Sequence, residues 1–338
     1  MISLKKGENT LSLIDTLGYY ARLDAVLITD DLSVDEPKPD LSGLLEENNR
    51  VQPMVMEMEE KDRMENFVID KNFSGGNVLL DGKKQDVVYI RPDLSDTSTD
   101  WFYWNFKATS DVDRVVTFKL INTGNKSLNL ISASGAAYST DEENWSFISE
   151  SAYKSVFTYT FKAGQSVHFA CTVPYVLSDL ESYITKIKAN NKNVKVSTLC
   201  TSEQRREVPL FTVGNEESGK AIVFTSRHHC CEASPSFLLE GLVDYISEEM
   251  PAEILDNYCF YIAPMMDVDG VENGDQGKQR IPHDHNRDYE EKMYNSVRAL
   301  TDFVADKNVV AFMDYHCPGL ADSVPYFYYD STSDKEEV

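Results

Sequence analysis

The stretch KAIVFTSRHHCCEASPSFLLEGLVDYISEE, Lys220 to Glu249, decides how the second half of the chain folds. It begins with an apolar run rich in β-branched residues, which is typical of a buried strand. Ser234 and Pro235 form a pair that commonly begins a helix, as N-cap and first helical residue. The stretch therefore predicts a strand, a turn over residues 227–233 and an amphipathic helix.

The chain after about residue 196 continues this alternation of strands and helices. Helix-like segments lie at 235–249 and 290–307, and further strand-like segments lie at 259–266, 309–316 and 324–330. Strands that alternate with helices favour an α/β sheet, in which the loops at one end of the strands carry the functional site.

The chain before residue 196 has a different composition. Residues 66–195 hold several short runs of β-branched and aromatic residues separated by turn residues, which predict a β-sandwich. A helix is predicted over residues 178–191, with Ser178 as its N-cap. Residues 1–65 hold 15 acidic and 7 basic residues and are predicted to be an acidic extension or linker. A multidomain chain is therefore expected, with its last part at 196–338.

The overall charge excludes some classes of partner. The formal net charge of −24 opposes binding to nucleic acid or to anionic membranes, since both are polyanions.

No apolar run approaches the roughly 20 residues that span a bilayer, and no signal peptide is recognisable. The six cysteines follow no disulfide-framework spacing. We therefore expect a cytoplasmic protein with reduced thiols, and the sequence does not indicate its oligomeric state.

Candidate metal ligands lie at the ends of two predicted strands. In the turn after the first strand, His229 and Glu232 are three residues apart and can point at one position. His316 ends a second strand 84 residues after Glu232, with Asp314 two residues before it. Two imidazoles and one carboxylate suit a zinc ion that keeps one position open for water.

Two other ligand sets remain open. Cys230 and Cys231 offer thiolates, which also suit zinc, although adjacent side chains point in divergent directions. His283 and His285 offer a second pair of imidazoles in a polar loop. The spacing of the residues alone does not decide between these sets.

Together these residues resemble the zinc metallocarboxypeptidases. His229-x-x-Glu232, the segment IAPMMDVDGV, the tetrad Asp284 to Arg287 and the strand end MDYH at His316 occur in the order and approximate spacing of that family. SGGNVLL, WFYWNF and VPYVLSDLESYI look like the β-sandwich that precedes the catalytic domain in the cytosolic carboxypeptidase branch. The resemblance covers roughly residues 66–330. It implies an antiparallel β-sandwich followed by an α/β/α catalytic domain.

The resemblance implies roles for residues around the metal. His229, Glu232 and His316 would hold one Zn²⁺ ion. Asp284 would support a ligand histidine from outside the metal shell, which fixes the tautomer and raises the basicity of the ligand. His285 stands at a position that the family directs away from the metal.

The resemblance also implies roles toward the substrate. Asn286 and Arg287 match the pair that grips the C-terminal carboxylate of a peptide, a task suited to the planar guanidinium fork. Arg280 matches the arginine that polarises the scissile carbonyl and stabilises its oxyanion, with Lys278 as an alternative. With Arg227, these cations form the dense basic group near the site, which would suit a substrate with acidic side chains.

The sequence departs from the family pattern in several places, including the missing glycine after the strand of the third ligand, where CPGLAD follows His316. The segment DVDG at 267–270 replaces the usual Asn-Pro-Asp-Gly and is expected to keep the turn. The family implies a general-base glutamate some tens of residues after the third ligand, whereas 22 residues follow His316 here. Glu336 and Glu337 lie in a charged tail, and neither is assigned as the base. We therefore expect the catalytic domain to be C-terminally incomplete, as in a fragment of a longer enzyme.

The resemblance implies a zinc-dependent metallocarboxypeptidase, a hydrolase that removes C-terminal residues from peptides or proteins. Two alternatives from other classes remain open. A zinc-retaining pseudoenzyme would bind C-terminal carboxylates without cutting the chain. An amidohydrolase or deacylase on the same scaffold would act on substrates that often lack a free C-terminal carboxylate, which the pair Asn286 and Arg287 disfavours.

Overall fold

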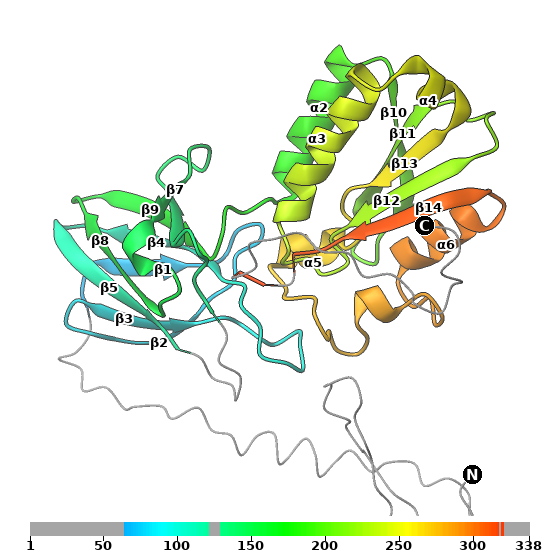
Figure 1. Ribbon diagram of the computed structural model, residues 1–338. Coiled ribbons are helices and arrows are strands. Elements are labelled where there is room, and N and C mark those ends of the chain that lie inside the picture. Colours follow the sequence, from blue (N-terminus) through cyan, green and yellow to red (C-terminus); the bar gives the residue numbers. More distant parts are fainter. Residues whose placement is uncertain (1–63, 122–128, 318, 321–338) are drawn as a thin grey trace, which may run out of the picture. The chain divides into compact units, whose positions relative to one another are not determined.

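Two β-sheets make up the first part of the structure (Figure 1). The computed structural model describes residues 64–121, 129–317 and 319–320, all within one compact unit of the chain, Met58–Val338. The strands are β1 (Phe67–Asp70), β2 (Leu79–Lys84), β3 (Val87–Arg91), β4 (Asn105–Ser110), β5 (Arg114–Leu120), β6 (Ala136–Ser139), β7 (Ser146–Ile148), β8 (Val156–Phe161) and β9 (Gln165–Ala170). A short 3-10 helix, η2 (Ser149–Ser151), follows β7. One sheet has the order β1-β4-β9-β6-β7 and the other has the order β2-β3-β5-β8.

An aromatic core lies between these two sheets. Phe106 of one sheet packs against Phe118 of the other, with ring centroids 5.4 Å apart, and Phe169 lies 5.1 Å from Phe118. Trp104 is fully buried and donates its indole N–H to the carbonyl oxygen of Leu130 over 2.6 Å. The two sheets therefore form the predicted sandwich, because inward side chains of both sheets fill the space between them.

One strand pair departs from the antiparallel arrangement that was expected. β3 and β5 are parallel, with Val87 opposite Thr117 and Ile90 opposite Leu120. β4 follows β3 in the sequence but lies in the opposite sheet, so the chain crosses over and returns in the same direction. Alternation of apolar and polar residues shows which face of a strand is buried, but it does not show which sheet the strand joins.

A mixed five-stranded sheet forms the second part. Its strands are β10 (Val194–Thr201), β11 (Glu207–Gly214), β12 (Ala221–Ser226), β13 (Cys259–Ala263) and β14 (Val309–Tyr315). The order is β10-β11-β13-β12-β14, and β12 is parallel to both of its neighbours. The helices are α2 (Leu177–Asn190), α3 (Ser234–Glu248), α4 (Ala252–Asn257), α5 (Val268–Asn273), the 3-10 helix η3 (His285–Arg287) and α6 (Asn295–Ala305). β10 and β11 were not predicted.

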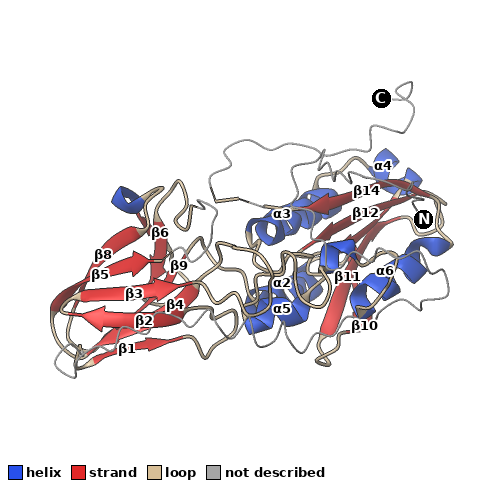
Figure 2. Ribbon diagram, turned by 90° about the horizontal axis from the view of Figure 1, so that it is seen from below, coloured by secondary structure: helices blue, strands red, loops and turns tan. Residues whose placement is uncertain are grey.

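Helices cover both faces of this sheet (Figure 2). Alternate side chains of a strand point to opposite faces, so each strand contributes to two clusters. Val223 and Tyr261 pack in one cluster with Leu300 of α6, whereas Phe224 and Ile262 pack in another with α2 and α3. This three-layer arrangement agrees with the α/β/α domain that the family resemblance implies.

Two helices begin earlier than predicted. The N-cap of α2 is Val176, whose backbone N–H donates to the carboxylate of Asp179 over 2.7 Å. Ser178 therefore lies inside the first turn, and Asp179, three residues after the N-cap, accepts the N–H of the N-cap residue. Similarly, Ala233 is the N-cap of α3, and Ser234 is its first helical residue.

Some predictions fall on parts of the chain that are not described. The acidic extension at 1–65, apart from its last two residues, and the strand at 324–330 lie outside the described residues. The boundary at residues 195 and 196 stays a prediction. Within the described ranges, no helix is both long enough and apolar enough to cross a bilayer.

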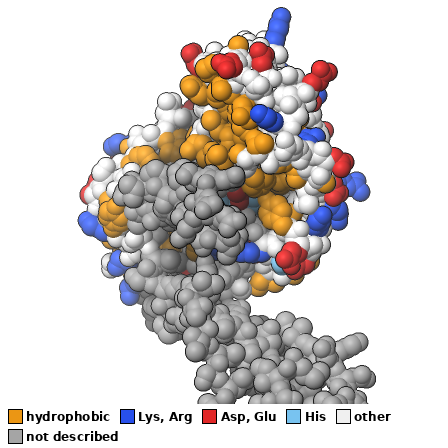
Figure 3. Space-filling view, turned by 45° about the vertical axis from the view of Figure 1, so that its right-hand side comes forward, with side chains coloured by type: hydrophobic (Ala, Val, Ile, Leu, Met, Phe, Trp, Pro, Cys, Tyr) orange, Lys and Arg blue, Asp and Glu red, His pale blue; other side chains and the backbone are white. Residues whose placement is uncertain are grey.

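Exposed apolar side chains gather on one face of the molecule (Figure 3). Among the exposed large apolar residues are Val310, Phe312 and Met313 of β14, which are between 41% and 48% exposed. β14 is the last strand in the order of the described sheet, and β12 is its strand neighbour. Among the described strands, β14 therefore pairs with β12 alone.

Candidate metal centre

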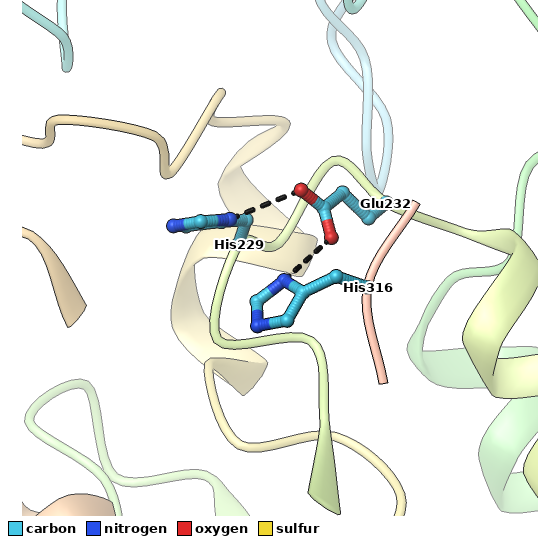
Figure 4. A group of neighbouring side chains, drawn as sticks. All are labelled: His229, Glu232 and His316. Carbon is cyan, nitrogen blue, oxygen red and sulfur yellow. Dashed lines mark hydrogen bonds and ion pairs between the residues drawn. The ribbon is translucent and has the colours of Figure 1, made fainter. Parts of the chain in front are cut away.

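The predicted ligands reach the same edge of the sheet because their strands are parallel neighbours. The last residues of β12 and β14 lie opposite each other. His316 follows β14 directly, and the turn after β12 begins at Arg227, whose φ is 63°. This left-handed conformation is uncommon for a residue with a side chain. It turns the chain so that His229 and Glu232 face His316 (Figure 4).

His229, Glu232 and His316 converge and form what we call the three-ligand cluster. Nδ1 of His229 lies 3.0 Å from Oε1 of Glu232, and Nδ1 of His316 lies 2.8 Å from Oε2 of the same carboxylate. One donor atom from each residue lies within 4.8 Å of the other two. His229 and Glu232 are buried, whereas the side chain of His316 is 23% exposed. The protein therefore buries two of the three side chains, and solvent reaches the third, His316.

The second nitrogens of both imidazoles face further carboxylates. Nε2 of His229 lies 3.3 Å from Oδ1 of Asp284, and Nε2 of His316 lies 2.7 Å from Oδ2 of Asp314. Thr225 donates its hydroxyl to the other oxygen of Asp314 over 2.8 Å. Asp284 thus lies behind His229, on the side away from Glu232. Asp314 was given no role, although its spacing of two from His316 indicated that both side chains would lie on the same side of the strand end.

These carboxylates determine the pKa values in the cluster. Burial opposes ionisation of Glu232, but hydrogen bonds from the two imidazoles outweigh it and lower its pKa to about 2. Burial also disfavours protonation of His316, yet hydrogen bonds to Asp314 and Glu232 raise its pKa to about 10. The pKa of His229 is raised as well, because Asp284 and Glu232 outweigh its burial. The carboxylates therefore favour positive charge on the two imidazoles, and the imidazoles favour negative charge on Glu232.

The donor set fits a zinc ion. Two imidazole nitrogens and one carboxylate are a common set of protein ligands in catalytic zinc sites. Asp284 and Asp314 hold the Nε2 atoms, so each imidazole turns its Nδ1 atom toward Glu232. Carboxylates placed behind metal-ligating histidines are the usual way in which proteins orient such ligands.

The rival ligand sets do not converge within the described part of the chain. Sγ of Cys230 donates to the carbonyl oxygen of Asp275 over 3.1 Å, whereas Cys231 packs in the core of the sandwich. Nδ1 of His285 lies 2.8 Å from Nδ1 of His228 and is not part of the three-ligand cluster. The two cysteines therefore diverge, as their adjacency in the sequence indicates.

His228 and His285 belong to a buried chain of hydrogen bonds beside the cluster. The hydroxyl of Tyr289 lies 3.0 Å from Nε2 of His228, and Nε2 of His285 lies 3.0 Å from Oγ of Ser296. Burial lowers the pKa of both imidazoles, and the pKa of His285 is lowered further by its neighbour His228. Both are therefore neutral at pH 7 and connect the turn after β12 to α6.

His283 lies in a separate group with Asp288 and Glu291. Its Nε2 lies 3.6 Å from Oδ1 of Asp288 and 3.5 Å from Oε2 of Glu291. Asp288 is fully buried, and its carboxylate accepts from the backbone N–H groups of Met293 and Tyr294. The predicted pairing of His283 with His285 is therefore replaced by two different sets of contacts.

Arg280 lies among carboxylates. Nη1 lies 2.6 Å from Oδ2 of Asp267, Nη2 lies 3.0 Å from Oδ2 of Asp275, and Nε lies 3.8 Å from Oδ2 of Asp96. Burial disfavours the charged guanidinium, but these acidic neighbours, Asp267 foremost, outweigh burial and raise the pKa of Arg280. In the described part of the chain, no hydrogen bond or ion pair joins Arg280 to the three-ligand cluster.

Asn286 and Arg287 lie next to the cluster. The side-chain amide of Asn286 is 3.2 Å from Nε2 of His316, and with its nitrogen facing Asp314 it lies 3.1 Å from Oδ2 of that residue. Arg287 is exposed and donates Nη1 to the carbonyl oxygen of Asn286 over 3.1 Å. An exposed guanidinium beside the cluster can bind a carboxylate in a bidentate manner.

The prediction that Arg227 belongs to a basic substrate-binding group is wrong. Arg227 is only 3% exposed, and its Nε donates to the carbonyl oxygen of Cys230 over 2.9 Å. Its Nη1 donates to the carbonyl oxygen of Tyr175 and to Oγ of Ser236. The guanidinium therefore binds carbonyl oxygens of the turn and of the segment before α2, together with a hydroxyl at the start of α3, and it is not available to a substrate.

Two family models match the chain in succession. The model described as cytosolic carboxypeptidase N-terminal domain matches residues 69–171, and the model described as zinc carboxypeptidase matches residues 180–296. Cytosolic carboxypeptidase 3 of Mus musculus is 25% identical over 292 residues, which cover 74% of this chain and 29% of that protein. Cytosolic carboxypeptidase 6 of Caenorhabditis elegans is 25% identical over 255 residues, which cover 66% of this chain and 54% of that protein.

Solved structures share the fold. A metallo-carboxypeptidase from Burkholderia cenocepacia matches with a TM-score of 0.61 at 19% identity, over 74% of this chain and 70% of that chain. The matched residues make up 29% of the length of the Mus musculus relative and 54% of the length of the Caenorhabditis elegans relative. A match to a cytosolic carboxypeptidase N-terminal domain, followed by a match to a zinc carboxypeptidase domain, makes the chain similar to the zinc carboxypeptidases and, among them, to the cytosolic carboxypeptidases.

Proposed function

We propose that the protein is a zinc-dependent metallocarboxypeptidase that hydrolyses C-terminal residues of peptides or proteins. The observation that supports this most is the three-ligand cluster, in which side chains from two neighbouring strand ends converge. The family supports the same reaction class. We further propose that the protein acts in the cytoplasm, in line with the cytosolic relatives that it matches.

The three-ligand cluster is proposed to hold one Zn²⁺ ion. Nδ1 of His229, Nδ1 of His316 and the carboxylate of Glu232 would be its protein ligands. When bound, the ion supplies Lewis acidity toward the scissile carbonyl and lowers the pKa of water toward 7. Asp284 and Asp314 keep the two imidazoles in the orientation that this binding needs.

Asn286 and Arg287 are proposed to bind the free C-terminal carboxylate of the substrate. Their place beside His316 would bring the last peptide bond close to the cluster. This pair would select chains with a free C-terminus, because an amidated end lacks the negative charge that the guanidinium binds. Arg280 remains the proposed oxyanion-binding residue, on the strength of the family resemblance alone.

The group that accepts the proton of the attacking water is not assigned. The family resemblance implies a glutamate, but Glu336 and Glu337 lie outside the described residues and neither is proposed. Loss of a general base typically lowers the rate by about 10²–10⁴. Metal binding and cleavage are therefore best measured separately.

The first test is the zinc content of the purified full chain. We expect one zinc ion per chain and expect His229→Ala to lose it. His283→Ala is the matched control, because His283 also faces two carboxylates but lies in another group. Unchanged zinc content in His229→Ala would refute the proposed ligands.

The second test compares two peptides that differ only in their last group, a free carboxylate or an amide. Release of the C-terminal residue from the free acid alone, lost in Arg287→Ala, would support a carboxypeptidase. Binding of the free acid without release would instead support the zinc-retaining, non-catalytic alternative. Cleavage of the amidated peptide at an equal rate would contradict the role of Asn286 and Arg287 and favour the amidohydrolase alternative.

A further inference from the structure

A loop of the β-sandwich contacts the loop that leads to the candidate metal centre. Asp96 lies between β3 and β4, and its carboxylate accepts from the backbone N–H groups of Gln276 at 3.0 Å and Gly277 at 2.9 Å. The carbonyl oxygen of Asp96 accepts from the N–H of Ile281 over 2.8 Å. One residue of the sandwich thus binds both ends of the segment between Gln276 and Ile281.

The two residues after Asp96 bind the middle of the same segment. Thr97 donates its hydroxyl to the carbonyl oxygen of Lys278 over 2.5 Å, and the N–H of Ser98 donates to the carbonyl oxygen of Gln279 over 3.2 Å. Gln279 has a φ of 48°, a left-handed conformation that is uncommon for a residue with a side chain. Contacts from the sandwich therefore hold a backbone conformation that the segment would not favour by itself.

Gln279 connects this segment to the three-ligand cluster. Its N–H donates to Oδ2 of Asp284 over 2.8 Å, while Oδ1 of Asp284 faces Nε2 of His229. Oδ1 also accepts from the N–H of Asn286 over 2.9 Å. The direction of the Asp284 carboxylate, and through it that of the His229 ring, thus depends on where the backbone of Gln279 lies.

We propose that Asp96, in the N-terminal β-sandwich, is a positioning residue for the metal centre of the neighbouring domain. It acts through the backbone of the segment from Gln276 to Ile281 and through Asp284, and it touches neither the metal nor the substrate. This inference rests on the proposed function, since it takes the three-ligand cluster to be a zinc site. It gives the sandwich a part in the chemistry of the site in addition to its part in the fold.

The test measures zinc affinity in the full-length chain by competition with a chromophoric chelator. Loss of a carboxylate behind a metal ligand typically lowers metal affinity 10- to 100-fold, which is the result expected for Asp284→Ala. We expect Asp96→Ala to lower affinity about tenfold, and Asp96→Asn, which keeps one acceptor oxygen, to recover part of that loss. Asp113→Ala is the control, because Asp113 is an exposed sandwich aspartate that contacts Lys162 and Ala163.

A double-mutant cycle separates positioning from general destabilisation. If Asp96 acts through Asp284, the double variant should bind zinc about as weakly as Asp284→Ala alone. The absorption spectrum of bound Co²⁺ should also change in Asp96→Ala and stay unchanged in Asp113→Ala. If Asp96→Ala does not fold, the zinc affinity and the Co²⁺ spectrum of Asp96→Asn are compared with those of the wild type instead.

Three results would overturn the proposal. Wild-type zinc affinity in both Asp96 variants would remove the positioning role while leaving the proposed function intact. Losses that multiply in the double variant would show that Asp96 does not act through Asp284. A wild-type chain that binds no zinc would refute the proposed function, and this inference with it.

Discussion

Gly270 lies at a place where an added methyl group has no room. It is the third residue of α5, and a Cβ at this position would lie 2.7 Å from Sγ of Cys230 and closer still to Nη2 of Arg280 and Oδ2 of Asp267. Arg280 and Asp267 form a buried ion pair of 2.6 Å, with side chains 9% and 5% exposed. Gly270→Ala should therefore force these two groups apart.

The expected loss of stability follows from three contributions. Overpacking of a tight interior costs about 1–3 kcal/mol. Removing one partner of a buried ion pair costs about 3–5 kcal/mol, so pushing the partners apart costs part of that. Alanine in place of glycine in a helix raises the free energy of unfolding by about 1 kcal/mol, which offsets part of these losses. We expect Gly270→Ala to lower the free energy of unfolding by about 2–4 kcal/mol.

Gly241 provides a matched control, because it lies within α3 and a Cβ there would meet nothing within 4 Å. Gly241→Ala should raise the free energy of unfolding by about 0.5–1 kcal/mol, the usual helix preference for alanine. Urea unfolding followed by circular dichroism measures both variants in the same way. A Gly270→Ala variant as stable as the wild type, or a shift of both variants in the same direction, would refute the argument.

Two further predictions concern other buried groups. Burial, together with Asp96 and Asp267, outweighs Arg280 and raises the pKa of Asp275 from 3.8 to about 6, so the folded state binds this proton more tightly than the unfolded state. The contribution of Asp275 to stability should therefore fall as the pH rises from 4 to 6. In urea unfolding, the free energy of unfolding of Asp275→Asn should rise relative to that of the wild type over the same range. Parallel pH profiles would contradict this. Cys230 and Cys231 are each 1% exposed, and burial raises the pKa of both thiols, so neither should react with a thiol reagent in the native protein. Mass spectrometry after labelling should find both modified only in denaturant, and rapid labelling of the native chain would disprove it.

The approximate place of the proposed metal ligands could be predicted because it depends on local patterns. An apolar run followed by a turn and an amphipathic helix defines β12 and α3, and parallel strands leave the sheet at one edge. These two facts are enough to bring His229 and Glu232 near His316. The spacing of two between Asp314 and His316 held similar information, because residues two apart in a strand share a face.

The surroundings of the arginines could not be predicted in the same way. Arg227 lies beside histidines in the sequence, and its burial follows from a left-handed turn that no periodicity reveals. Arg280 pairs with Asp267 and Asp275, and it also approaches Asp96, which is distant in the sequence and lies in a loop of the β-sandwich. Loop side chains have no repeating direction, so their partners depend on the packing of whole domains. Charge and sequence proximity alone therefore gave the wrong role for Arg227.

The place of β14 at the end of the described sheet has a consequence for how a bound metal ion would affect the fold. Two proposed ligands follow the inner strand β12, and the third follows β14, whose strand neighbour in the described sheet is β12. An ion bound by all three would be released whenever the edge strand detached. By mass action, a ligand that binds only the attached state at one hundred times its dissociation constant stabilises that state by about 2.7 kcal/mol. The supply of metal in the surroundings would then set how often this strand opens.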